Sequence, residues 1–133
     1  MQVGKQFKFD AAHHIEGHPL CGKTHGHTWT LTVTLTGVLD SKGMLIDFHR
    51  LGVLVRGYIG LIDHEDINEV FTNESMFQDL PITAETLSIW FATNLANCLK
   101  SYSNLDQVGC RVQEGEGGWA ESYERIHYGQ TCV

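Results

Sequence analysis

Two histidines separated by one glycine, His25 and His27, have the spacing that most directly indicates chemistry in this sequence. An alternating run of threonines and apolar residues follows them, from Thr28 to Thr36, which is typical of a β-strand with one buried face. Because side chains two positions apart on a strand point to the same side, both imidazoles can reach one metal ion. Spacing alone leaves open a second interpretation, in which the two rings only bond to nearby backbone.

A third imidazole is expected from residues 3–13, which also have the pattern of a strand. The odd-numbered residues of this segment are mostly apolar, so His13 falls on the more buried face and His14 on the wetter one. We therefore favour His13 as the third ligand, and we interpret His18 as a loop residue. Three neutral imidazoles with an open fourth position form the ligand set of a catalytic zinc ion.

Cys21 lies four residues before His25, next to Gly22 and Lys23. A polar, electropositive surrounding of this kind favours the thiolate form, so the thiol is a candidate acid or base rather than a ligand. Cys98 and the remaining cysteines are interpreted differently, because Cys98 and Cys110 lie in apolar segments and Cys132 lies in the tail. No pair of cysteines has the C-x-x-C spacing of a zinc finger or a thioredoxin motif.

The composition fits one domain over residues 1–133 and excludes several classes of protein. A formal net charge of −7 argues against a nucleic-acid partner, which would require a basic face. The sequence shows neither a secretory leader nor an apolar run long enough to span a membrane, so we expect a cytoplasmic protein with free thiols.

The elements that must position these residues are expected in the order ββααββ. Strands are predicted at residues 3–13, 25–38, 107–114 and 119–128, with a helix from Asp47 to about Ile62 and a second helix capped by Thr83. Residues 69–82 are predicted to be a loop. Two locally connected strand pairs predict an α+β fold, an antiparallel sheet with both helices on one face.

Two acidic motifs are ambiguous from spacing alone. Asp63 and His64 follow the first helix and read as a polar helix terminus. Glu114 ends a strand before a glycine-rich turn, where a carboxylate is usually solvated.

Taken together, the motifs resemble the 6-pyruvoyl-tetrahydropterin synthase / 6-carboxy-tetrahydropterin synthase family. The resemblance covers about residues 6–123. The motifs that carry it are Phe9-Asp10-Ala11-Ala12-His13, Cys21-x3-His25-Gly26-His27, Gly43-Met44-Leu45-Ile46-Asp47-Phe48, Asp63-His64-x2-Ile67-Asn68, Thr83-x-Glu85, and Val112-x-Glu114 followed by Trp119-Ala120. The resemblance implies the tunnelling fold, in which sheets from several subunits close into a barrel. It also implies a homohexamer, a dimer of trimers, with active sites at subunit interfaces.

The resemblance also implies residue roles and a substrate, 7,8-dihydroneopterin triphosphate. Cys21 matches the family's proton-abstracting thiol, and Asp63 with His64 matches the dyad that works with it. Glu114 matches the carboxylate that anchors the pterin ring, and Thr83 lies where the family lines the pterin pocket. The zinc ligands implied are His13, His25 and His27.

The short spacing between Cys21 and His25 resembles the 6-carboxy branch, which releases acetaldehyde and triphosphate in queuosine biosynthesis. The alternatives are 6-pyruvoyl-tetrahydropterin synthase, a related pterin lyase or aldolase, and a zinc-binding structural protein without catalysis. Two departures from the family pattern affect the pocket wall: Ile82 separates Pro81 from Thr83, and the segment 69–82 is longer than is usual in the bacterial form. A third departure is Gly115, which replaces the family's usual threonine after the glutamate.

A triphosphate substrate requires a local positive pocket in a chain with net charge −7. Lys23 is the first candidate because it lies beside Cys21. The other candidates are Lys5, Lys8, Arg50 and Arg56.

Overall fold

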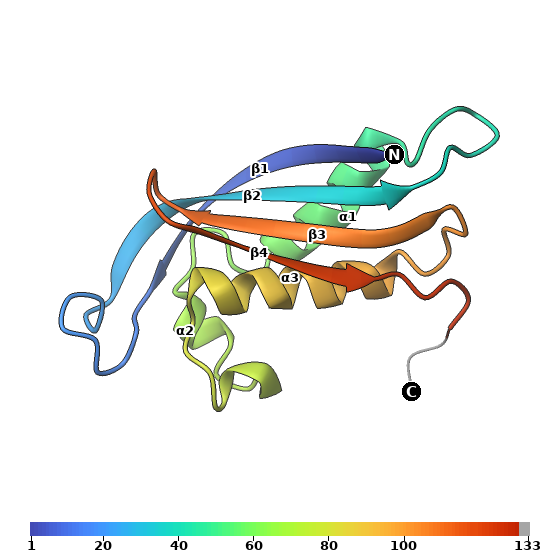
Figure 1. The fold of residues 1–133 in the computed structure, drawn as a ribbon. Coiled ribbons are helices and arrows are strands. Elements are labelled where there is room, and N and C mark those ends of the chain that lie inside the picture. The colour runs from blue at the N-terminus through green and yellow to red at the C-terminus, as the bar shows by residue number, and fades with distance from the viewer. Residues whose placement is uncertain (131–133) are drawn as a thin grey trace.

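The protein is an antiparallel four-stranded sheet with helices inserted between its second and third strands (Figure 1). The computed structural model describes residues 1–130, so the prediction for Cys132 lies outside the described residues. The strands lie side by side in chain order. The elements are β1 (Gln2–His13), β2 (His25–Gly37), α1 (Phe48–Ile59), α2 (Ile67–Val70), the 3-10 helix η1 (Ser75–Phe77), α3 (Ala84–Cys98), β3 (Leu105–Glu114) and β4 (Trp119–Arg125). Within residues 1–130, no helix is long and apolar enough to cross a membrane.

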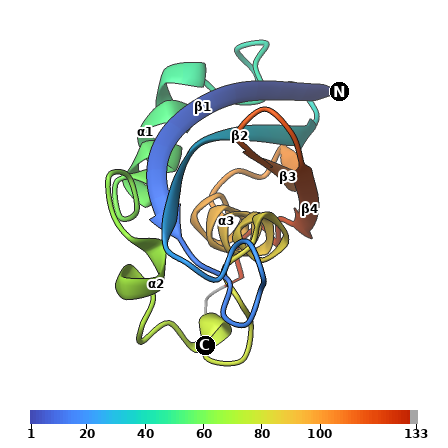
Figure 2. The same ribbon diagram turned by 90° about the vertical axis from the view of Figure 1, so that its left-hand side faces the viewer.

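One face of the sheet is buried, as the alternation of β1 and β2 predicts. The odd-numbered residues of β2 from Trp29 to Leu35 are fully buried, while the threonines between them stay partly exposed. Phe9 lies opposite Trp29 in the β1–β2 register, and the two rings stack with centroids 6.1 Å apart. The buried residues of α1 and α3 join the same hydrophobic core. Figure 2 shows β1 and β2 curving around α3, so the core lies inside this curve.

Side-chain caps fix where the two longer helices begin. Asp47 accepts a hydrogen bond from the His49 N–H at 2.7 Å and caps α1, as predicted. Thr83 caps α3 by accepting from the Thr86 N–H at 3.2 Å, and the Thr86 hydroxyl accepts from the Thr83 N–H in return. This reciprocal arrangement satisfies two backbone N–H groups that a helix start otherwise leaves unpaired.

Three predicted boundaries need correction. Residues 69–82 are not only loop, because α2 runs into them and η1 lies within them. The first helix ends at Ile59 rather than near Ile62, and Gly60 is its C-cap. Ile62 lies in the turn after the helix, where its side chain is buried in the core. The last strand ends at Arg125 rather than at 128.

Candidate metal and active site

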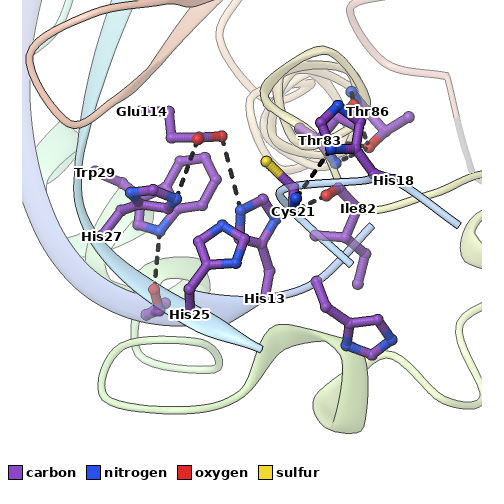
Figure 3. A network of polar contacts seen from close by, with 12 residues as sticks. His13, His18, Cys21, His25, His27, Trp29, Ile82, Thr83, Thr86 and Glu114 are labelled. Carbon is purple, nitrogen blue, oxygen red and sulfur yellow. Dashed lines mark hydrogen bonds and ion pairs between the residues drawn. The ribbon is translucent and has the colours of Figure 1, made fainter. Parts of the chain in front are cut away.

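Three imidazoles meet where the end of β1 pairs with the start of β2 (Figure 3). His13 lies opposite His25 in the register, and His27 lies opposite Ala11. The ring centroids of His13 and His25 are 4.7 Å apart, those of His25 and His27 are 4.7 Å apart, and those of His13 and His27 are 5.3 Å apart. With Glu114, each residue offers one ligand atom within 4.8 Å of the others. The strand parity therefore brings together the three histidines that the sequence singles out.

Backbone carbonyls fix the orientation of two of these rings. His13 Nδ1 lies 2.8 Å from the Ile82 carbonyl oxygen, and His25 Nδ1 lies 2.6 Å from that of Lys23. A carbonyl oxygen only accepts, so Nδ1 carries the proton in both rings and Nε2 keeps its lone pair. Imidazoles that bind metals are oriented in this way. Ile82, one of the departures from the family pattern, supplies one of these carbonyls.

The unpaired ring nitrogens fit a cation. The buried Nε2 atoms of His13 and His27 have no hydrogen-bond partner among the described residues 1–130. Glu114 Oε1 comes within 3.0 Å of His27 Nε2, but without hydrogen-bond geometry. Burial lowers the pKa of His13 from 6.5 and outweighs the nearby Ile82 carbonyl and Glu114, which raise it. A neutral, buried imidazole with an orphaned nitrogen is suited to a metal, and this donor set fits the Zn²⁺ that the resemblance implies.

Glu114 is not the solvated carboxylate that its position in the sequence favours. It pairs with Trp29 across β2 and β3, and its Oε2 lies 3.7 Å from His13 Nε2. It also lines a cavity of about 360 Å³ together with Thr83 and Trp119. The two residues expected at the pterin, Glu114 and Thr83, thus share one cavity beside the imidazoles. Trp119, which the sequence analysis left without a role, adds an aromatic wall.

Cys21 is half-buried in a tightly turned loop between β1 and β2. The His18 ring nitrogen Nδ1 accepts a hydrogen bond from the Cys21 N–H at 2.9 Å (Figure 3). It also accepts one from the Leu20 N–H at 3.1 Å. A Cβ at Gly22 would come within 2.6 Å of the His18 carbonyl oxygen, so only glycine fits this turn. His18 therefore positions the Cys21 backbone and is not one of the four clustered ligands, a role that its spacing did not reveal.

Asp63 and His64 lie in close contact at the outer edge of β1. His64 Nδ1 lies 2.9 Å from Asp63 Oδ1, and the same carboxylate oxygen accepts from the Asp10 N–H at 3.0 Å. The His64 N–H donates to the Asp10 carbonyl at 2.6 Å, and His64 has a φ of 61°, which non-glycine residues seldom adopt. These two backbone bonds hold the pair against β1.

The carboxylate of Asp10 lies close to Asp63 and His64, and the sequence analysis gave Asp10 no role. Its carboxylate accepts from the Thr28 hydroxyl at 2.5 Å, and ligand atoms of Asp10, Asp63 and His64 lie within 4.8 Å of one another. The positions of Asp10 and Thr28 are even-numbered, so their side chains lie on the sheet face opposite the clustered imidazoles. Within residues 1–130, no hydrogen bond or ion pair joins this group to the imidazoles.

The outer edge of β1 also bonds to the segment after the dyad, close to the three clustered imidazoles. The Ala12 N–H donates to the Glu65 carbonyl at 2.9 Å. The Asn68 side chain then accepts from the His14 N–H at 2.9 Å and donates to the His14 carbonyl at 3.1 Å. The segment that carries the dyad thus also fixes the end of β1, next to His13.

Comparison with known proteins agrees with this arrangement. The model of the 6-pyruvoyl tetrahydropterin synthase family matches residues 2–125. The chain belongs to this family. It is 39% identical over 139 residues to the 6-carboxy-5,6,7,8-tetrahydropterin synthase of Haemophilus influenzae, covering 92% of this chain and 99% of that protein. It is 33% identical over 126 residues to a putative 6-carboxy-5,6,7,8-tetrahydropterin synthase of Archaeoglobus fulgidus, covering 91% and 94%.

A solved structure confirms the predicted fold class. The 6-pyruvoyl tetrahydropterin synthase of Caenorhabditis elegans superposes with a TM-score of 0.75 at 20% identity, covering 92% of this chain and 94% of that one. At this identity the likeness concerns the fold alone, which is the α+β tunnelling fold. Membership of the family makes the chain one of a group of pterin-processing enzymes.

Proposed function

We propose that the protein is a zinc-dependent 6-carboxy-5,6,7,8-tetrahydropterin synthase, with residues 1–133 forming one cytoplasmic domain. It converts 7,8-dihydroneopterin triphosphate and water into 6-carboxytetrahydropterin, acetaldehyde and triphosphate for queuosine biosynthesis. The observation that carries the proposal is the cluster of three imidazoles with two orphaned nitrogens, placed beside Glu114 and preceded by Cys21 at the short spacing. The two 6-carboxy relatives above support the choice of branch.

In this proposal His13, His25 and His27 hold the zinc ion. When bound, zinc supplies Lewis-acid chemistry, which makes a carbon-bound proton next to a carbonyl more acidic. The Glu114 carboxylate suits the two parallel N–H donors on one edge of a pterin, and its place in the Thr83 cavity puts that edge near the imidazoles. Thr83 lines this cavity from the start of α3.

Proton transfer is assigned to Cys21 and to the dyad. The thiol removes a proton from the substrate side chain, and His64, oriented by the 2.9 Å contact with Asp63, carries out the second transfer. In this proposal a neighbouring subunit supplies the dyad. This is supported by Asp10 and Thr28, whose side chains lie beside the dyad on the sheet face opposite the clustered imidazoles, and it fits the homohexamer, a dimer of trimers, that the resemblance implies.

The test is to incubate the purified protein with zinc and 7,8-dihydroneopterin triphosphate and to identify the product by mass spectrometry. We expect 6-carboxytetrahydropterin and acetaldehyde from the wild type and neither from Cys21→Ala. A pyruvoyl product or a simple aldol cleavage would assign the protein to one of those alternatives. Zinc binding without any turnover would support the alternative of a zinc-binding structural protein without catalysis.

A further inference from the structure

The outer edge of β1 is paired, toward its end, by a segment that is not a strand. The His64 N–H donates to the Asp10 carbonyl at 2.6 Å, and the Ala12 N–H donates to the Glu65 carbonyl at 2.9 Å. One edge of a strand offers the backbone N–H and C=O groups of every second residue. After Asp10 and Ala12, the next residue that requires a partner on this edge is His14.

The backbone of the pairing segment does not continue to His14, because it turns into α2. Asp66 caps this helix by accepting from the Asn68 N–H at 3.1 Å, so that N–H is already used. Ile67, the first residue of α2, is fully buried and anchors the turn in the core. The pairing of β1 therefore has to be completed in another way.

The side chain of Asn68 completes it. Asn68 Oδ1 accepts from the His14 N–H at 2.9 Å, and Asn68 Nδ2 donates to the His14 carbonyl at 3.1 Å. A carboxamide has both an acceptor and a donor, so it reproduces the pairing that a peptide group would give. Asn68 Nδ2 also lies 3.5 Å from His14 Nε2, which places the His14 ring beside Asn68 and outside the imidazole cluster.

These bonds fix both neighbours of His13. Ala12 and His14 are bonded along the outer edge, while His13 pairs with His25 on the inner edge. β1 ends at His13 and a loop follows, so without Asn68 the outer edge would be bonded only as far as Ala12. A zinc ion requires its ligand atoms at set distances and directions, and a displaced strand end would displace the His13 ring with it.

We propose that Asn68 is a positioning residue for the metal site, which holds the end of β1 so that His13 presents its Nε2 to the ion. The inference rests on the proposed function, which assigns His13, His25 and His27 to zinc. Asn68 acts through the His14 backbone and is not itself a ligand. Removal of groups that orient metal ligands weakens metal binding ten-fold to hundred-fold, and we expect about ten-fold for a group one step further out.

The test is the affinity of the metal-free protein for Zn²⁺, measured by competition with a chromophoric chelator. Asn68→Ala removes both bonds to His14 and should weaken zinc binding about ten-fold. Asn68→Asp keeps the size of the side chain and the acceptor but sets an oxygen against the His14 carbonyl, so it should also weaken binding. Thermal melting checks folding, and Asn68→Asp supplies the comparison if Asn68→Ala does not fold.

Asn104→Ala is the matched control. The Asn104 amide also links backbone segments, because it donates to the Val38 and Leu45 carbonyls at 2.9 Å each, beyond the end of β2 that lies away from the imidazoles. Its loss should leave zinc affinity unchanged even where it lowers stability. Co²⁺ gives a second readout, since its visible absorption reports coordination geometry. At saturating Co²⁺, the spectrum of Asn68→Ala should differ from that of the wild type, and the spectrum of Asn104→Ala should not.

Equal zinc affinity and equal cobalt spectra for Asn68→Ala and the wild type would overturn the positioning role. An equal loss of affinity in Asn104→Ala would also overturn it, because the effect would then follow from lost stability. Zinc binding that depends on Asn68 in a protein without lyase activity would retain this inference and reject the proposed reaction. An active zinc enzyme whose affinity is unchanged in Asn68→Ala would do the reverse.

Discussion

Acidifying the metal-free protein should destabilise it through one buried imidazole, that of His13. Burial lowers the pKa of His13 below its ordinary value of 6.5, so the unfolded chain binds this proton more readily than the folded chain. The stability that depends on neutral His13 is therefore present above pH 6.5. It is lost as the pH falls from 6.5 toward the pKa of His13 in the folded state. One proton corresponds to at most about 1.4 kcal/mol of unfolding free energy per pH unit.

The measurement is urea denaturation after treatment with a chelator, at pH 7.5, 6.5 and 5.5 and at one protein concentration. His13→Gln removes the titration, so the stability difference between wild type and His13→Gln should shift by up to about 1.4 kcal/mol between pH 6.5 and 5.5. His49→Gln, at an exposed position, should leave the pH profile of the wild type unchanged. A difference between wild type and His13→Gln that is constant over this range would refute the assignment of a depressed pKa to His13.

Three further predictions concern the site. His27→Ala should lose zinc and activity together, whereas Cys21→Ala should keep zinc and lose turnover. Metal analysis and the product assay measure both effects, and an active Cys21→Ala enzyme would show that the thiol is not the base. His18→Ala should lower kcat at unchanged zinc content, and His18→Asn should restore it, because an asparagine oxygen can accept the same backbone N–H groups; a failure of His18→Asn to exceed His18→Ala would count against positioning by the ring. Thr83→Ala should lower the unfolding free energy by about 1 kcal/mol through loss of the α3 cap, which denaturation would measure, and an unchanged stability would contradict the capping role.

Local patterns predicted the parts of the site that lie on single strands. The parity of β1 placed His13 on the buried face, and it is fully buried. The His25-Gly26-His27 spacing placed two rings on the same face, and their centroids are 4.7 Å apart. Both predictions needed only the two-residue period of a strand, which any stretch of sequence displays directly.

Features that depend on pairing between distant segments escaped the sequence. Glu114 reaches the imidazoles because β3 pairs with β2 in a register that sets it opposite Trp29, and no local pattern encodes that register. Asp10 meets the dyad across 53 residues of chain. The helix α2 was missed for another reason: four residues are too few for a helical period to appear, although Asp66 caps it by accepting from the Asn68 N–H at 3.1 Å.

The opposite faces occupied by the dyad and the imidazoles have a genetic consequence. If a neighbouring subunit completes each site, a chain with Cys21→Ala and a chain with His64→Ala are each inactive alone, yet each carries the half that the other lacks. Co-assembled at equal amounts, they should regain roughly one quarter of the wild-type sites, because each half is intact with a chance of about one in two. Mixing the separately folded variants without subunit exchange should restore nothing. Activity in the co-expressed pair would therefore report complementation between subunits, and its absence would place the whole site within one chain.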